Sequence, residues 1–200
     1  MLESITPLFP SPLLQFKHEE AEKLNQLLLS EAEAIRQGSA GVNKSNQRGW
    51  HSEPDLFRRE DPGIKELCRF IVQAVQTAEQ KTSSQKEIPS QMQVMGWINI
   101  NGTGAFNTPH AHEGFRWSGC YYVNQPKVAE GRSGYIEFLD PRSGIQGWPV
   151  KGASFGNTKV ALRPSAGSLL LFPSYLVHWV YPNEEEDERV SIAFNARYTT

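Results

Sequence analysis

The sequence lacks the features that mark membrane, secreted and disulfide-stabilised proteins. Its 200 residues include two cysteines, Cys68 and Cys120, which we interpret as small buried side chains rather than a disulfide framework. The first ten residues contain neither the basic nor the apolar segment of a secretory leader, and no later apolar run is long enough to cross a bilayer. The mean hydropathy of -0.49 is that of a polar chain. We therefore expect a cytoplasmic protein without a membrane span.

A marked excess of either charge is also absent. Lys and Arg number 20 and Asp and Glu number 22, which gives a net charge of -2 at pH 7 and a pI near 6.2. Proteins that bind duplex nucleic acid or anionic membranes need a basic surface, so we expect neither partner. No heptad pattern marks an interface, and a homodimer is the default expectation for the oligomeric state.

Two helices are expected in the N-terminal part of the chain. Apolar residues recur with a helical period over residues 18–36, and Gly38 ends the pattern. A second helix is expected to begin at Asp61-Pro62, because Asp can cap a helix and Pro suits its first turn. Residues 39–52 between them are rich in Gly, Asn, Ser and Gln, which predicts a loop.

From Gln91 onward the pattern changes to short apolar or alternating runs separated by Gly, Pro and Asn, which is typical of β-sandwiches and barrels. We expect strands over residues 92–100, 117–123, 135–139, 158–162, 168–172, 177–181 and 189–196. The chain is short enough for one domain over residues 1–200. We expect it to be mostly β, with helical support over residues 1–88 and a β core over residues 89–200.

Three of the five histidines lie in this β core. His110 and His112 are separated by one residue, so on an extended strand both side chains project to one face and can reach one metal ion. Glu113 would then point away. A bulge could instead turn Glu113 inward, so a carboxylate ligand stays open. His178 stands alone after an apolar strand, and its role depends on the segments around it.

Those segments resemble the 2-oxoglutarate oxygenases. Residues 164–173 (PSAGSLLLFP), His178 and residues 189–191 (RVS) resemble the distal part of that family's signature, and residues 109–112 (PHAH) resemble its proximal His-x-Asp/Glu metal motif. Residues 134–138 (GYIEF) resemble a strand that prolyl-4-hydroxylase-like members place between the two. Residues 8–12 (LFPSP) and 49–52 (GWHS) are similar to a group of small bacterial and phage members. The resemblance therefore extends over nearly the whole chain.

The resemblance implies a double-stranded β-helix, the jelly roll shared with cupins, preceded by two packing helices. It also implies a dioxygenase that uses Fe(II), 2-oxoglutarate as cosubstrate and O2, and that hydroxylates a small-molecule or peptide substrate while 2-oxoglutarate becomes succinate and CO2. His110, His112 and His178 are then the catalytic metal ligands. His112 stands where most members carry a carboxylate, although the small-oxygenase group is similar to this chain in having His-x-His.

The cosubstrate needs a fixed cation, and a guanidinium can bind a carboxylate through paired hydrogen bonds. Arg189 is the candidate, and Ser191 shares its strand face and can donate to the same carboxylate. The polar residues 181–188 predict a hairpin that returns antiparallel to the strand of His178, which would keep ligand and cation close. We interpret the acidic run 184–188 as a solvated loop.

Other candidates flank this set. Asn99 precedes His110 by the interval at which the nucleic-acid-dealkylating branch carries a cosubstrate-binding Asn, and Asn101 shares its strand face; both are equally compatible with turn chemistry before Gly102. Tyr121 is placed with the cosubstrate, and its neighbour Tyr122, which must face the other way, stays an alternative. Candidate substrate contacts are Trp50, His51, Arg116, Trp117, Trp148 and Tyr175.

Three other functions fit parts of the pattern. Three imidazoles can hold zinc for hydrolysis, although Arg189 and Ser191 would then have no role. A cupin-like isomerase or dioxygenase would share the fold and lack 2-oxoglutarate. A non-catalytic binding or structural module would keep only the sandwich. The oxygenase is favoured because buried His and Arg side chains are costly unless a metal or an anion satisfies them.

Overall fold

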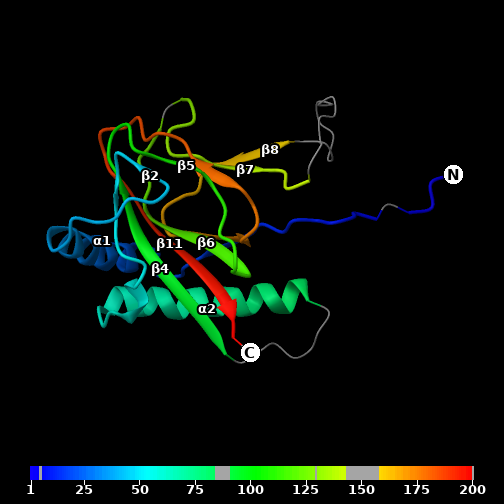
Figure 1. The fold of residues 1–200 in the computed structure, drawn as a ribbon, viewed down its shortest axis with the longest axis horizontal. Helices are drawn as coiled ribbons and strands as arrows, with labels where there is room; N and C mark the ends of the chain where they lie inside the picture. Colours follow the sequence, from blue (N-terminus) through cyan, green and yellow to red (C-terminus); the bar gives the residue numbers. More distant parts are fainter. Residues whose placement is uncertain (5, 84–90, 129, 143–157, 200) are drawn as a thin grey trace.

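Two antiparallel β-sheets face each other, and two helices cover the outer face of one of them (Figure 1). The computed structural model describes residues 1–4, 6–83, 91–128, 130–142 and 158–199. One sheet has six strands in the order β1-β9-β6-β11-β4-β3, and the other has five in the order β2-β5-β10-β7-β8. The strands are β1 Leu14–Lys17, β2 Asn46–Gln47, β3 Trp50–His51, β4 Met92–Asn101, β5 Phe106–His110, β6 Trp117–Asn124, β7 Ile136–Leu139, β8 Lys159–Leu162, β9 Ser168–Pro173, β10 His178–Val180 and β11 Arg189–Tyr198.

Each of the seven strands expected after Gln91 is present, with ends within two residues of those expected. The helices are α1 Ala21–Gln37 and α2 Pro62–Thr82, with a 3-10 turn η1 at Leu56–Arg58 between them. None of the described helices is long and apolar enough to span a membrane. The expected combination of a β core and two preceding helices is therefore confirmed.

The start of α2 is capped from α1. Pro62 occupies the first turn as expected, but Asp61 makes no capping hydrogen bond. The carboxylate of Glu31 accepts hydrogen bonds from the backbone N–H groups of Gly63 at 2.8 Å and Ile64 at 3.0 Å. These N–H groups have no partner within the helix, so the carboxylate satisfies them and joins the two helices.

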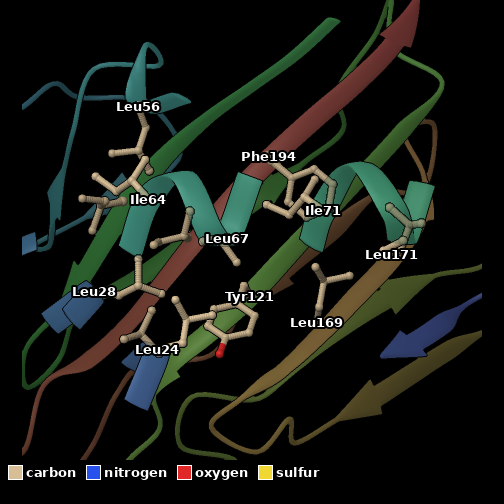
Figure 2. Close-up of a cluster of buried hydrophobic side chains, with 14 of the residues drawn as sticks. Leu24, Leu28, Leu56, Ile64, Leu67, Ile71, Tyr121, Leu169, Leu171 and Phe194 are labelled. Atoms are coloured by element: carbon tan, nitrogen blue, oxygen red, sulfur yellow. The ribbon is translucent and has the colours of Figure 1, made fainter. Parts of the chain in front are cut away.

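The main hydrophobic core lies between the helices and the outer face of the six-stranded sheet (Figure 2). Alternate residues of β11, namely Val190, Ile192 and Phe194, point to this face, and α2 contributes Leu67 and Ile71. The intervening residues of β11 must then point to the opposite face, between the two sheets. A smaller apolar cluster lies there, made of Cys120, Tyr122, Ile136, Phe138, Leu170, Phe172 and Leu176. The inner face of the larger sheet is therefore the place where polar residues of its strands can converge.

The predicted loop over residues 39–52 contains two short strands. β2 pairs with β5 in the five-stranded sheet, and β3 pairs with β4 in the six-stranded sheet. Arg48, with a positive φ of 59°, lies between them where the chain turns from one sheet to the other. The expectation of a loop missed this pairing because two-residue strands have no detectable period. The segment bridges one edge of the sandwich.

The hairpin predicted after His178 is wrong. β10 belongs to the five-stranded sheet and β11 to the six-stranded sheet, so the turn between them crosses the sandwich. The buried amide of Asn183 holds this crossover, since its Nδ2 donates to the carbonyls of Asn101 at 3.0 Å and Asp187 at 2.8 Å. His178 and Arg189 are consequently brought together by two facing sheets rather than by neighbouring strands.

Candidate active site

Three histidines converge between the sheets. His110 ends β5 and His178 begins β10, and the two are partners in the antiparallel register of these strands. His112 follows two residues after the end of β5. Each of the three offers a nitrogen within 4.8 Å of those of the other two. Their ring centroids are 4.4 to 5.3 Å apart, so the three imidazoles form one compact cluster.

Backbone carbonyls orient two of these rings. His110 Nδ1 is 2.7 Å from the carbonyl oxygen of Thr108, and His178 Nδ1 is 2.9 Å from that of Leu176. A carbonyl oxygen accepts hydrogen bonds and cannot donate them, so each Nδ1 must carry the proton. Nε2 then keeps its lone pair in both rings. Outer hydrogen bonds of this kind orient metal-binding histidines.

Burial keeps the imidazoles neutral. It lowers the pKa of His110, lowers that of His112 to about 4 and lowers that of His178 to about 3. The proximity of His110 contributes to the lower pKa values of the other two. At neutral pH all three rings therefore present lone pairs, which a divalent metal ion requires.

The geometry favours His112 over Glu113 in this cluster. The backbone N–H of His112 donates to the carbonyl of Ser174 at 3.0 Å, which holds the chain against the β9–β10 connection after it leaves β5. Glu113 is exposed and is not part of the cluster. A donor set of three neutral nitrogens suits a divalent transition metal, and it contains no carboxylate.

Arg189 lies in the same cavity as the three histidines. Its side chain is 2% exposed, its Nη1 donates to Ser191 Oγ at 3.1 Å, and its guanidinium lies 5.2 Å from the ring centroid of Tyr122. No carboxylate among the described residues forms an ion pair with it, and none of the described residues that line the cavity is acidic. A buried guanidinium in this setting favours an anionic ligand.

The placement of Tyr121 with the cosubstrate is wrong. Its hydroxyl donates to Asn25 Oδ1 at 2.8 Å, and its ring packs among the core residues below the helices (Figure 2). Tyr122 takes the opposite face and lines the cavity, because neighbouring residues of a strand alternate. Burial raises the pKa of Tyr122 well above its ordinary value, so the hydroxyl stays protonated. That hydroxyl has no hydrogen-bond partner among the described residues.

The two predicted asparagines differ in position. Asn99 lines the cavity and its Oδ1 has no partner in the described part of the chain. Asn101 is 1% exposed and lies outside the cavity lining, where its Nδ2 is 3.4 Å from Asn107 Oδ1. Asn107 does line the cavity and was not predicted. Asn107 lies three residues before His110, so its proximity to that histidine is visible in the sequence. The sequence does not indicate that its side chain faces the cavity.

Trp97 and Cys120 were also not predicted to line the cavity. Alternation places Trp97 with Asn99 on β4 and Cys120 with Tyr122 on β6, so the phase of either strand would have revealed them. Burial raises the pKa of the Cys120 thiol, which therefore stays protonated and contributes a small apolar surface.

The predicted substrate contacts are divided between several places. His51 is 4% exposed and stacks on Trp97 with ring centroids 5.6 Å apart, and Trp97 in turn lies 5.7 Å from the ring of His112. Trp50 donates its indole N–H to the carbonyl of Ser39, away from the cavity. His51 is therefore the candidate that the structure brings close to the histidine cluster.

Arg116 and Trp117 belong to a structural contact instead. Arg116 Nε and Trp117 Nε1 donate to the carboxylate of Glu79 on α2, at 2.9 Å and 2.6 Å. This contact ties α2 to the start of β6. Tyr175 is 53% exposed and its hydroxyl lies 3.0 Å from Ser11 Oγ. Trp148 lies outside the described residues.

Binding of Ni(II) to the histidine cluster should quench the fluorescence of Trp97, because that indole lies next to His112. We expect a saturable loss of intrinsic emission on titration with Ni(II) at pH 7.5, and Trp97→Phe should remove most of it. Trp50→Phe is the control and should keep the quenching. Quenching that persists in Trp97→Phe, or that is unchanged in His178→Ala, would contradict this arrangement.

Residues 95–195 match a family model described as "Putative 2OG-Fe(II) oxygenase". No curated protein matches the chain in sequence. A crystal structure of a Pseudomonas putida prolyl-4-hydroxylase has a TM-score of 0.64 and 17% identity, over 94% of this chain and 93% of its own. HygX from Streptomyces hygroscopicus, solved with nickel and 2-oxoglutarate bound, has a TM-score of 0.62 and 12% identity, over 94% of this chain and 84% of its own.

The carbocyclase SnoK from nogalamycin biosynthesis has a TM-score of 0.68 and 11% identity, over 94% of this chain and 80% of its own. At such identities the likeness shows the fold, which is the double-stranded β-helix expected from the sequence. The family model itself covers half of the chain and includes the three histidines and Arg189. The chain therefore belongs to the 2OG-Fe(II) oxygenase family and is an Fe(II)- and 2-oxoglutarate-dependent oxygenase.

Proposed function

We propose that this oxygenase hydroxylates a small-molecule or peptide substrate, with iron held by His110, His112 and His178 and 2-oxoglutarate held by Arg189. One observation carries the proposal. A single cavity contains three neutral imidazoles and a buried guanidinium, and no acidic residue among its described lining. The residues fit both groups, since the imidazoles offer lone pairs to a metal and the guanidinium requires an anion.

The charges of the site support a dianionic cosubstrate. Fe(II) and the guanidinium would bring three positive charges into a cavity whose described lining offers no carboxylate. Opposite charges attract strongly in a poorly hydrated interior, so a molecule with two carboxylates is favoured there. His112 stands where most family members supply a carboxylate ligand. The net charge of the site is therefore more positive by one.

Several neutral donors complete the proposed cosubstrate site. Arg189 offers the N–H groups of a planar fork, and Ser191 lies within hydrogen-bond distance of it. The Tyr122 hydroxyl is protonated and has no partner among the described residues, so it can donate to a carboxylate. We assign these three residues to the distal carboxylate of 2-oxoglutarate. Asn99 is assigned to the part of the cosubstrate that lies nearer the iron.

Bound Fe(II), 2-oxoglutarate and O2 together supply the oxidation of a C–H bond, with 2-oxoglutarate converted to succinate and CO2. The chain contributes orientation and exclusion of water. Phe172 and Phe138 pack at 4.8 Å and 5.9 Å from the ring of His178, which shields that side of the cluster. The carbonyls of Thr108 and Leu176 hold two of the imidazoles in the tautomer that binds metal.

Hydroxylation is the outcome we propose, and the fold alone does not select it. SnoK, which shares the fold, is a carbocyclase, and the fold also occurs in the epimerase SnoN. An oxygen-18 atom from labelled O2 in the product would establish hydroxylation. A product without the label would indicate a cyclisation or an epimerisation instead.

The two free thiols, Cys68 and Cys120, support the cytoplasm as the compartment of this protein.

Arg189→Met should raise the 2-oxoglutarate concentration needed for half-maximal succinate formation by about 100-fold, because hydrogen bonds to a charged carboxylate contribute up to about 3 kcal/mol. Nickel quenching of Trp97 should be unchanged, since the histidines are untouched. Arg197→Met is the matched control, because Arg197 occupies the same face of β11 at its other end. An unchanged 2-oxoglutarate requirement in Arg189→Met, or an equal effect in the control, would defeat the assignment.

A further inference from the structure

The Nε–H group of Arg189 has no role in the proposed cosubstrate site. Nη1 contacts Ser191, and the fork of the guanidinium is available to a carboxylate. Nε is buried and has no hydrogen-bond partner in the part of the chain that the structure describes. A buried donor without a partner costs free energy, so an acceptor for Nε would stabilise this side chain. A hydrogen bond at Nε would add a second restraint on the guanidinium, beside the one from Ser191.

Gly134 lies beside the side chains of Arg189 and Gln125. A Cβ atom at this glycine would lie 3.2 Å from Arg189 Cδ and 3.7 Å from Arg189 Nε. The same Cβ would lie 2.8 Å from Nε2 of Gln125. Gly134 also has a φ of +65°, which a residue with a side chain rarely adopts. The Arg189 stem and the Gln125 amide therefore both lie next to a residue that leaves room for them.

Gln125 carries the complementary group. Its Oε1 is buried and, like Arg189 Nε, has no partner among the described residues. Rotation of the amide by half a turn exchanges Oε1 and Nε2 and brings the oxygen to the position next to Gly134. An acceptor without a donor and a donor without an acceptor would then be neighbours. A hydrogen bond between them would give both Gln125 Oε1 and Arg189 Nε a partner.

We propose that Gln125 is a positioning residue of the cosubstrate site, whose Oε1 accepts a hydrogen bond from Arg189 Nε and directs the guanidinium fork to the distal carboxylate of 2-oxoglutarate. This inference rests on the proposed function. The same pairing occurs at the other end of β11, where Arg197 Nε donates to Gln93 Oε1 at 2.8 Å. The proposed Gln125–Arg189 pair is the same kind of hydrogen bond, from arginine Nε to glutamine Oε1, between buried atoms.

The backbone around Gln125 is held in place. The residue follows β6 directly, and Arg163 donates to the carbonyls of Pro126 at 2.9 Å and Val128 at 3.1 Å. On the opposite side, the Gly134 N–H donates to the carbonyl of Pro182 in the crossover that leads to Arg189. A fixed backbone on both sides allows the glutamine to orient the arginine at a small entropic cost.

The test measures 2-oxoglutarate affinity by calorimetry on Mn(II)-loaded protein, where no turnover takes place. Gln125→Met keeps the length of the side chain and removes the acceptor, and we expect it to weaken 2-oxoglutarate binding by about fivefold to tenfold, the effect of one such hydrogen bond. Affinity for 2-oxobutyrate, which lacks the distal carboxylate, should not change. Gln93→Met, which removes the equivalent bond to Arg197, is the matched control and should bind both ligands as the wild type does.

Gln125→Asn is the second variant, because it stays polar and falls one methylene short of Arg189. Like Gln125→Met, it should weaken the binding of 2-oxoglutarate and leave the binding of 2-oxobutyrate unchanged. Wild-type affinity for 2-oxoglutarate in either folded variant would overturn the inference. An equal loss for both ligands would also overturn it, because general damage to the site has that effect. If wild-type protein with metal bound takes up neither ligand, the proposed function fails and this inference fails with it.

Discussion

The site depends on positive charge buried without an acidic partner. Arg189 is 2% exposed, three imidazoles lie in the same cavity, and no acid among the described residues lines it. Burial keeps the imidazoles neutral, which removes three further charges and leaves lone pairs. Such a cavity is stabilised when a metal and an anion bind in it together. The metal satisfies the imidazole lone pairs, and the anion offsets the positive charges of the metal and the guanidinium. We therefore expect electrostatic coupling between the binding of metal and of cosubstrate.

Residues that pack the core and residues that line the cavity lie on different faces of the larger sheet. β11 shows the division within one strand, because Val190, Ile192 and Phe194 pack under the helices while Arg189 and Ser191 face the cavity. The five-stranded sheet supplies His110 and His178 from neighbouring strands. The helices stabilise the outer face of the larger sheet, so its inner face can carry polar groups. The distance between the sheets therefore sets the distance between the histidines and Arg189.

Periodicity in the sequence predicted much of this arrangement. Alternating and apolar runs predicted the strands after Gln91, and the spacing of His110 and His112 predicted that they converge. Turn composition could not distinguish a hairpin from a crossover between sheets, because polar residues suit either. Alternation also left the phase of β6 open, so Tyr121 was chosen where Tyr122 lines the cavity. Gln125 carries no motif and becomes visible only beside Gly134 and Arg189.

The most direct measurement is an anaerobic titration of the Fe(II)-loaded protein with 2-oxoglutarate, followed by visible absorption. A chelate of 2-oxoglutarate on ferrous iron has a weak charge-transfer band, and no substrate is needed to observe it. We expect a band that saturates with 2-oxoglutarate in the wild type and is absent in His178→Ala. Iron that is bound by the wild-type protein and gives no band with 2-oxoglutarate would contradict the claim that both meet in this cavity.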